Sequence, residues 1–292
     1  MLINAYCQDR GWLFRDLLGL YAAAGAAVSQ DPLPRADAWI CVRTDEWSRC
    51  PDPSRLVLEV HDLWPHRWPD AVGALALCHP DQRPPSTARF SLMRPLGALR
   101  AMKPLPRRRD ATTRLTAGWV GRPAQLRGGD VKSPTPLIEA LRQMAAREPC
   151  RLILAGTGLA TYATAAARVP GLEVGHCDRS THPIDQYPEI YAAMDVLCIT
   201  STTDAGPLPL FEALACGTPV LSTPVGWATR MLRGDNGWVY GHGELAQALE
   251  DARAARFFSP EDIRASLGDA WLDGPGGWIE ETLGLARRLV AA

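Results

Sequence analysis

The sequence predicts an α/β protein with parallel sheets in two domains, on three observations. Short apolar runs alternate with helical patterns along most of the chain, which is the order expected of strands joined by crossover helices. The clearest case runs from Val196 to Thr223, where two buried-strand patterns flank a helix pattern. A chain of 292 residues with 47% hydrophobic content is also long enough to bury two cores.

The first domain is expected at residues 1–112 and has a Rossmann-like beginning. Leu2–Cys7 is a short apolar strand pattern, and the amphipathic helix after it ends at Gly25. Further strands are expected at 36–43, 55–62 and 71–79.

The second domain is expected at residues 113–274, and a separate last helix at 275–292. Strands are predicted at 115–122 and 151–158, and helices at 135–149, 187–195 and 244–258. The pair Asn236 and Gly237 predicts a hairpin-like turn.

Two carboxylates bracket the loop in the middle of this second domain. Asp204 lies in the loop at 201–208, Glu212 lies in the helix that Gly217 ends, and seven residues separate the two acids. The loop opens at the carboxyl edge of the predicted sheet, where parallel folds bind ligands, and the free amides at the helix start favour a phosphate. Because carboxylates repel phosphate, their better partners are ribose or sugar hydroxyls. A nucleotide-sugar supplies both kinds of group.

Composition argues against several classes of protein. No apolar run reaches the 18 residues of a membrane helix and the N-terminus lacks a signal-like pattern, so a cytoplasmic protein without a transmembrane segment is expected. The eight cysteines form no CxxC pair, so neither disulfides nor a zinc site is indicated. No GxGxxG follows the first strand, which disfavours a dinucleotide-dependent oxidoreductase.

The stretch from Gly206 to Gly226, GPLPLFEALACGTPVLSTPVG, is long and specific. Together with the acid before it, this stretch resembles the retaining, family-four (group 1) glycosyltransferases, whose hallmark is Glu, seven residues, Glu. Two residues depart from that pattern, because Asp204 replaces the first Glu and Ala205 replaces the usual Gly.

The resemblance implies the GT-B fold, in which two Rossmann-like domains have parallel sheets facing a central cleft, here with a shortened first domain. It implies a helix at 275–292 that packs back toward the first domain. It also implies that a sugar moves from a nucleotide-sugar, UDP- or GDP-linked, to an acceptor hydroxyl with retention, and that no metal or other cofactor is needed.

The resemblance also assigns donor-side roles. Arg122 and Lys132 are placed on the donor diphosphate, and the chemistry agrees, since fixed cations stabilise the charge on a departing nucleoside diphosphate. Glu212 is expected to bind the ribose and Asp204 the sugar. The remaining donor-binding candidates are residues of loops at the same sheet edge: Gly121, Gly156, Gly158, Gly206, Pro207 and Leu208.

Acceptor-side candidates come from the first domain. Gly11 follows the first strand in the loop that carries a Gly-Gly pair in the family, and Trp12 beside it is either an acceptor-side residue or a packing residue. His61 and Asp62 end a predicted strand, and His61 either contacts the sugar or acceptor hydroxyl or hydrogen-bonds a loop backbone. His61 is included among the catalytic candidates.

A basic, proline-rich segment at 89–114 is expected to connect the domains. It is either a solvated linker or a rim that attracts an anionic acceptor, such as a lipid-linked glycan or DNA. The leading acceptor is a glycan, lipid carrier or small molecule. The alternatives are hydroxymethyl-pyrimidine bases in DNA, or a catalytically silent nucleotide-sugar binding module.

Overall fold

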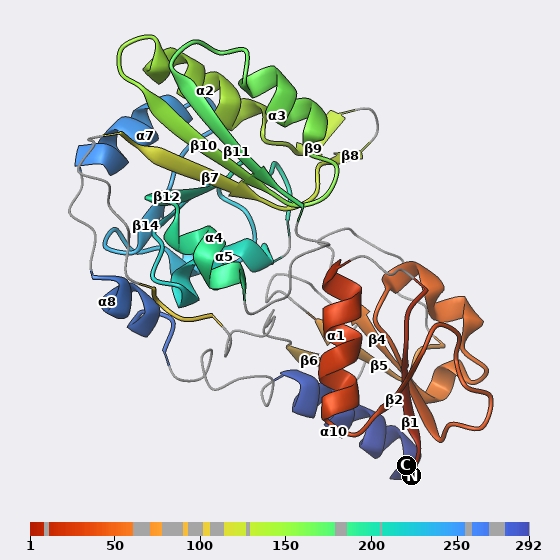
Figure 1. Cartoon of the computed structure of the whole chain (residues 1–292). Helices are drawn as coiled ribbons and strands as arrows, with labels where there is room; N and C mark the ends of the chain where they lie inside the picture. Colours follow the sequence, from red (N-terminus) through yellow and green to blue (C-terminus); the bar gives the residue numbers. More distant parts are fainter. Residues whose placement is uncertain are drawn as a thin grey trace. The chain divides into compact units, whose positions relative to one another are not determined.

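The computed structural model describes residues 1–8, 12–60, 71–77, 90–92, 102–105, 114–126, 129–178, 186–204, 206–254, 259–268 and 278–291 (Figure 1). The chain forms two compact units, residues 1–98 with 273–292 and residues 99–272. The domain limits expected near 112 and 274 stay predictions, because both fall outside the described residues.

The first unit is built on a six-stranded, fully parallel sheet with the order β2-β1-β3-β4-β5-β6. The strands are apolar and short, as expected of strands covered on both faces. Their bounds are β1 Ile3–Tyr6, β2 Ala27–Ser29, β3 Ala38–Cys41, β4 Leu56–Val60, β5 Ala74–Leu77 and β6 Phe90–Leu92.

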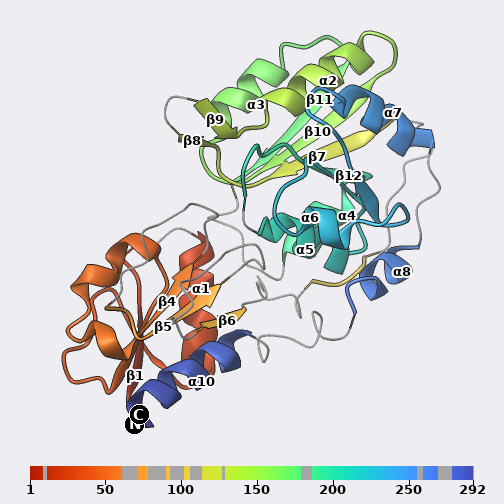
Figure 2. The ribbon, with the colours of Figure 1, turned by 180° about the vertical axis from the view of Figure 1, so that it is seen from behind.

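Alternation along β4 shows how this sheet is covered. Leu56, Leu58 and Val60 pack into a core with Trp39 on one face. Glu59 points to the other face, where it accepts a hydrogen bond from the Tyr21 hydroxyl. Tyr21 belongs to α1 (Trp12–Ala23). The helix α10 (Trp278–Ala291) packs on β3, β4 and β5, and its Thr282 adjoins the same Tyr21 hydroxyl (Figures 1 and 2). Two short 3-10 helices, η1 (Thr44–Arg49) and η2 (Pro53–Arg55), connect β3 to β4.

The second unit is built on another six-stranded parallel sheet, with the order β11-β10-β7-β12-β13-β14. In chain order its strands are numbered 3-2-1-4-5-6, which is the doubly wound arrangement of dinucleotide-binding folds. Their bounds are β7 Thr116–Val120, β10 Cys150–Ala155, β11 Leu172–Cys177, β12 Val196–Ile199, β13 Val220–Ser222 and β14 Gly237–Val239.

Helices cover both faces of the second sheet (Figures 1 and 2). On one face α2 (Thr135–Ala145), α3 (Ala160–Ala166) and α7 (Leu245–Ala254) enclose an apolar core that includes Trp119. On the other face lie α4 (Tyr187–Ala192) and α5 (Leu208–Ala215), and α8 (Pro260–Ala265) packs on α5. The short α6 (Ala228–Met231) precedes β14. The prediction of an α/β fold with parallel sheets in two domains is confirmed.

Two local predictions were incomplete or wrong. No strand was predicted between the Gly-Arg turn at 121–122 and the helix at 135–149, but the structure has an antiparallel ribbon there, β8 (Ala124–Leu126) with β9 (Gly129–Lys132). Asn236 and Gly237 do not make a hairpin, because β14 begins at Gly237 and runs parallel to β13. A side chain at Gly237 would meet the Val220 carbonyl oxygen at 1.9 Å, so the glycine permits close strand approach rather than a turn.

Candidate functional site

The site in the second unit lies at the point where the strand order of its sheet reverses. β7 and β12 are neighbours in the sheet, and β10 and β13 extend it on opposite sides. Chains that leave β7 and β12 at their carboxyl ends therefore separate to either side. In folds of this kind, ligands bind between the loops at such a point, which here are the loops after Val120 and Ile199.

Trp119 and Thr200 join these two strand ends. The buried Trp119 indole Nε1 donates a hydrogen bond of 2.9 Å to the Thr200 hydroxyl. The same hydroxyl donates to the carbonyl oxygen of Ser133, which directly follows β9. One threonine side chain thus links β7, β12 and the end of the ribbon. The Thr202 amide adds a 2.9 Å bond to the Val131 carbonyl, so the loop after β12 is held against β9.

Two glycines close the edge of the sheet beside this link. The Gly121 amide donates 2.9 Å to the Ala155 carbonyl at the end of β10. A side chain at Gly156 would meet the Gly121 carbonyl oxygen at 1.7 Å, and Gly156 has φ +149°. Only a glycine lets the loops after β7 and β10 approach so closely. Gly158, two residues further on, has φ +74° and open space around it.

Lys132 reaches this edge from the end of β9. Its Cε lies 3.1 Å from the position that a Cβ on Gly121 would occupy, so its stem lies over that glycine. Its Nζ lies 3.1 Å from Asp204 Oδ2, in an ion pair whose side chains are 26% and 15% exposed. The structure therefore brings together three predicted site residues, Gly121, Lys132 and Asp204, from three separate segments of the chain.

Asp204 is held at both carboxylate oxygens. Oδ2 faces Lys132, and Oδ1 accepts a 3.2 Å hydrogen bond from the Gly206 amide. The second contact is a side-chain turn that mimics a backbone turn. This turn fixes the backbone at residues 204 and 206, just before the start of α5.

The start of α5 lies near the same loop. Pro207 is buried and lies at the N-cap, with Leu208 as the first helical residue. No side chain of the described residues caps this helix. Pro209 has no N–H and the Leu210 amide donates a 2.9 Å hydrogen bond to the Pro207 carbonyl, so of the first three helical positions only the Leu208 amide is left for an anion. Arg122, directly after Gly121, is exposed and has no ion pair with any described acid. The predicted cationic and amide groups thus belong to neighbouring loops of one sheet edge.

Glu212 is the second acid of the pattern, and it is 2% exposed. It lies in the second turn of α5 and accepts a hydrogen bond from the Tyr191 hydroxyl of α4. Thr218 in turn donates 2.9 Å to the Tyr191 carbonyl. The Glu212 carboxylate is therefore fixed by a neighbouring helix.

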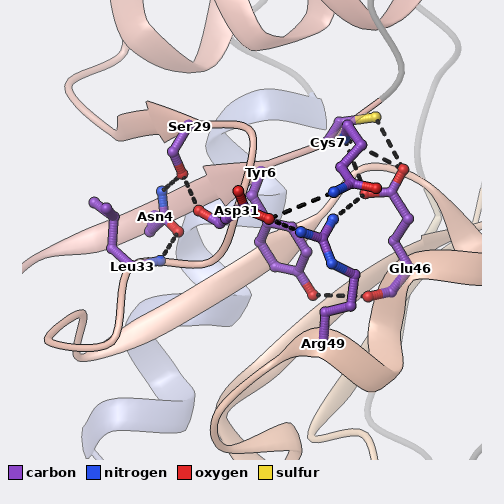
Figure 3. Close-up of polar contacts among 9 residues, drawn as sticks. Asn4, Tyr6, Cys7, Ser29, Asp31, Leu33, Glu46 and Arg49 are labelled. Carbon is purple, nitrogen blue, oxygen red and sulfur yellow. Dashed lines mark hydrogen bonds and ion pairs between the residues drawn. The ribbon is translucent and has the colours of Figure 1, made fainter.

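The first unit has its own reversal point, between β1 and β3, and a polar network fills it (Figure 3). The Glu46 side chain is 9% exposed, and both of its carboxylate oxygens accept hydrogen bonds from the backbone amide of Gln8, at 2.9 and 3.2 Å. Arg49 bridges Glu46, at 3.4 Å, and Asp31. The Tyr6 hydroxyl donates to the Glu46 carbonyl. These bonds fix the backbone where the chain leaves β1.

Several predicted residues lie outside the part of the chain that the structure describes. Gly11, His61 and Asp62 on the acceptor side are among them, as is Ala205. Trp12 begins α1, but its side chain is not described. Of the basic residues at 89–114 the described ones are Lys103 and Arg114, and Arg114 pairs with Glu173 at 2.7 Å. The roles assigned to these positions stay predictions.

The sequence prediction missed the residues that hold the site together. Thr200 and Trp119 are 81 positions apart, and Tyr191 is 21 positions from Glu212. The one local sign of this contact in the sequence is the hydroxyl of Thr200, which lies at the end of a buried strand directly before the loop at 201–208. Glu46 was missed as well, because nothing local marks it as a partner of the residue after β1.

Two findings concern metals and membranes. The described residues include no group of three or more His, Cys, Asp and Glu side chains that could hold a metal ion. Among the helices described, none has the length and apolar character to cross a bilayer.

Comparison with known proteins assigns the second unit to a class. Residues 114–255 match the family model described as Glycosyl transferases group 1. A D-inositol 3-phosphate glycosyltransferase of Catenulispora acidiphila is 34% identical over 134 residues, which are 41% of this chain and 31% of that protein. An N-acetyl-alpha-D-glucosaminyl L-malate synthase of Bacillus anthracis is 24% identical over 48% of this chain and 36% of that protein. The matches thus span about a third of these relatives.

Solved structures match the fold over the whole chain. Anabaena Alr3699/HepE, solved in complex with UDP, is 15% identical, covers all of both chains and has a TM-score of 0.68. The apo lipopolysaccharide outer core galactosyltransferase WaaB is 12% identical over 99% of each chain, with a TM-score of 0.61. The fold is GT-B, and the resemblance to the group 1 glycosyltransferases that the sequence predicted is confirmed.

Proposed function

We propose that the chain transfers a sugar from a UDP-linked donor to an acceptor hydroxyl, with retention of anomeric configuration. The observation that carries the proposal is the arrangement at the switch point of the second unit, where Lys132 lies over Gly121 with Arg122 next in the chain. This arrangement falls within the stretch that matches the group 1 glycosyltransferases. HepE has been solved with UDP and with UDP-glucose, which supports UDP as the nucleotide.

The reaction breaks the bond between the anomeric carbon of the sugar and an oxygen of the diphosphate. It forms a bond from that carbon to the acceptor oxygen, on the same face, and the acceptor proton passes to the leaving phosphate oxygen. Negative charge grows on the diphosphate as it departs. Arg122, Lys132 and the Leu208 amide at the start of α5 are the groups proposed to stabilise that charge.

Glu212 is proposed to bind the ribose of the donor. A carboxylate held by Tyr191 on a neighbouring helix is a preorganised acceptor for two adjacent hydroxyl groups. Asp204, whose carboxylate adjoins the ammonium of Lys132, is proposed to lie between the diphosphate and the sugar.

The proposed reaction needs no metal ion. Two cationic side chains and the start of a helix supply the positive charge that a divalent cation supplies in other transferases. Turnover that is unchanged by a chelator, and unchanged when Mg²⁺ or Mn²⁺ is added back, would support this part. Activity lost with the chelator and restored by one metal would contradict it.

The acceptor is proposed to be a glycan or a small polar molecule with a free hydroxyl. Two of the relatives are named for small anionic compounds, D-inositol 3-phosphate and L-malate. An anionic acceptor of this size is therefore the first to test.

The decisive experiment measures release of nucleoside diphosphate from a panel of UDP- and GDP-sugars, each with a pool of hydroxylated acceptors. Transfer is expected with a UDP-sugar, and NMR of the product is expected to show the anomeric configuration of the donor. If UDP binds but no donor and acceptor pair releases it, the chain is a nucleotide-sugar binding module. If UDP does not bind, the proposed donor site is wrong.

A further inference from the structure

The Lys132 and Asp204 ion pair raises a question that the proposed reaction leaves open. Lys132 is one of the cations proposed to bind the donor diphosphate. In the structure its Nζ forms an ion pair with Asp204 Oδ2, 3.1 Å away. A diphosphate that enters this sheet edge meets the ammonium and the carboxylate together. Its charge attracts the first and repels the second.

We propose that Asp204 is a built-in counter-ion that competes with the diphosphate for Lys132 and so promotes release of the nucleoside diphosphate after transfer. This inference rests on the proposed function, because it concerns the same ligand. In the release of the nucleoside diphosphate, Asp204 is a positioning residue, because it acts on the diphosphate through Lys132.

The geometry favours competition because Asp204 is anchored independently of Lys132. Its Oδ1 accepts the Gly206 amide, and that contact keeps the carboxylate in place when the lysine moves. The Lys132 stem lies over Gly121 and its side chain is 26% exposed, so the ammonium can turn from Asp204 toward a ligand beside Arg122. When the ligand leaves, the fixed carboxylate is there to take the ammonium back.

Partial burial of the pair strengthens the attraction between Lys132 and Asp204 with which the diphosphate competes. The side chain of Asp204 is 15% exposed, so its charge is screened less than that of a surface pair. The exposed pair Arg142 and Glu139 on α2 belongs to the same unit and provides the contrast, with side chains 58% and 52% exposed. Removal of one carboxylate from each pair changes the net charge of the protein equally.

Asparagine is the substitution that isolates the effect. Asp204→Asn keeps an oxygen for the Gly206 amide but replaces the carboxylate charge that holds Lys132. We expect UDP to bind Asp204→Asn about three- to tenfold more tightly than the wild type, the range for one partly screened charge beside a phosphate. The Glu139→Gln control is expected to bind UDP as the wild type does. Isothermal titration of the full chain measures both.

A Lys132→Met background tests whether the lysine carries the effect. If Asp204 acts by occupying Lys132, the gain in UDP affinity from Asp204→Asn disappears when Lys132 is methionine. A gain that persists in that background would show direct repulsion between carboxylate and diphosphate, and it would overturn the competition. Asp204→Ser, which also keeps an oxygen near Gly206, replaces Asp204→Asn if that variant does not fold, as judged by circular dichroism.

The outcomes separate this inference from the proposed function. Unchanged or weaker UDP binding by Asp204→Asn, with normal binding by the wild type, overturns the counter-ion role and leaves the donor site standing. Failure of the wild type to bind UDP overturns the donor site and the inference with it. With a transferring acceptor in hand, Asp204→Asn is also expected to show stronger product inhibition by UDP, by the same factor.

Discussion

The Tyr191 hydroxyl on α4 donates a hydrogen bond to the Glu212 carboxylate on α5, inside the second unit. Both side chains are almost fully buried, at 0% and 2% exposure. A buried carboxylate is tolerated only where donors satisfy it, so this tyrosine is part of what permits an acid in the helix. It also fixes the direction in which Glu212 presents its charge.

Replacement of that hydroxyl tests the link between stability and donor binding. Tyr191→Phe is expected to lower the free energy of unfolding by about 1.5–3 kcal/mol, the range for a hydrogen bond to a charged group, and to weaken UDP binding. Urea unfolding and titration with UDP measure the two effects. Tyr187→Phe removes another buried tyrosine hydroxyl from α4 and serves as the control, with UDP affinity unchanged. Equal UDP affinity in Tyr191→Phe and the wild type would contradict the proposal that Glu212 binds the ribose.

Thr200 is expected to contribute to stability through its two contacts. Thr200→Val keeps the shape of the side chain but removes the acceptor of the buried Trp119 indole. An unsatisfied buried donor costs about 1–3 kcal/mol, and that loss is expected in urea unfolding followed by tryptophan fluorescence. Thr164→Val removes an exposed hydroxyl from α3 and is expected to change stability by less than about 0.5 kcal/mol. A loss of similar size in both variants would contradict the role of the Trp119 bond.

Arg122 directly follows Gly121 at the sheet edge and has no ion pair with a described acid, so its charge is expected to serve the leaving diphosphate. Arg122→Ala is expected to lower turnover by about 100-fold, as does loss of one oxyanion donor in other enzymes, without loss of stability. Arg142→Ala removes an exposed arginine from α2 and is expected to keep full turnover. The assignment fails if Arg122→Ala transfers sugar at the wild-type rate.

Most of the fold could be predicted from the sequence because buried parallel strands are apolar throughout. β12 is an example, since all four residues of Val196–Ile199 are buried and the strand was predicted at that place. Short strands escaped prediction: β2 has three residues, and only its pairing with β1 makes it a strand. Gly237 misled for a related reason, because its role depends on the backbone of Val220, 17 positions earlier.

The residues of the site could be predicted from local sequence patterns, but the contacts between them could not. Lys132, Asp204 and Glu212 stand out by residue type and spacing, but nothing in the sequence indicates that Lys132 pairs with an acid 72 positions later. That contact depends on β9, whose ribbon brings the lysine over Gly121. Long-range side-chain pairs of this kind are set by the packed fold.

Alkaline pH is expected to destabilise the first unit through Cys41. Burial raises the pKa of this thiol from 9.0 to about 12 in the folded state, whereas in the unfolded chain it titrates in its ordinary range. Between about pH 9 and pH 12 the unfolded chain releases a proton that the folded chain keeps, so stability falls as pH rises; below about pH 9 the contribution is fully present. Urea unfolding of wild type and Cys41→Ala at pH 7.5, 9.5 and 10.5 tests this, and the wild type is expected to lose up to about 1.4 kcal/mol more per pH unit above pH 9. Parallel slopes in the two proteins would refute it.

The last prediction concerns the two glycines at the edge of the second sheet. Gly156→Ala would place a methyl group 1.7 Å from the Gly121 carbonyl oxygen, and a backbone atom cannot move aside as a flexible side chain does. The loops after β7 and β10 must therefore separate, and because Lys132 lies over Gly121, UDP binding is expected to be lost along with several kcal/mol of stability, roughly 3 or more. Gly158→Ala is the matched control, since its Cβ meets nothing within 4 Å and only the positive φ of +74° opposes the side chain. That variant is expected to lose about 1–2 kcal/mol and to keep most of its affinity for UDP. Thermal unfolding with and without UDP distinguishes the two variants, and equal losses in both would mean that backbone strain, rather than the contact between the loops, is what these glycines relieve.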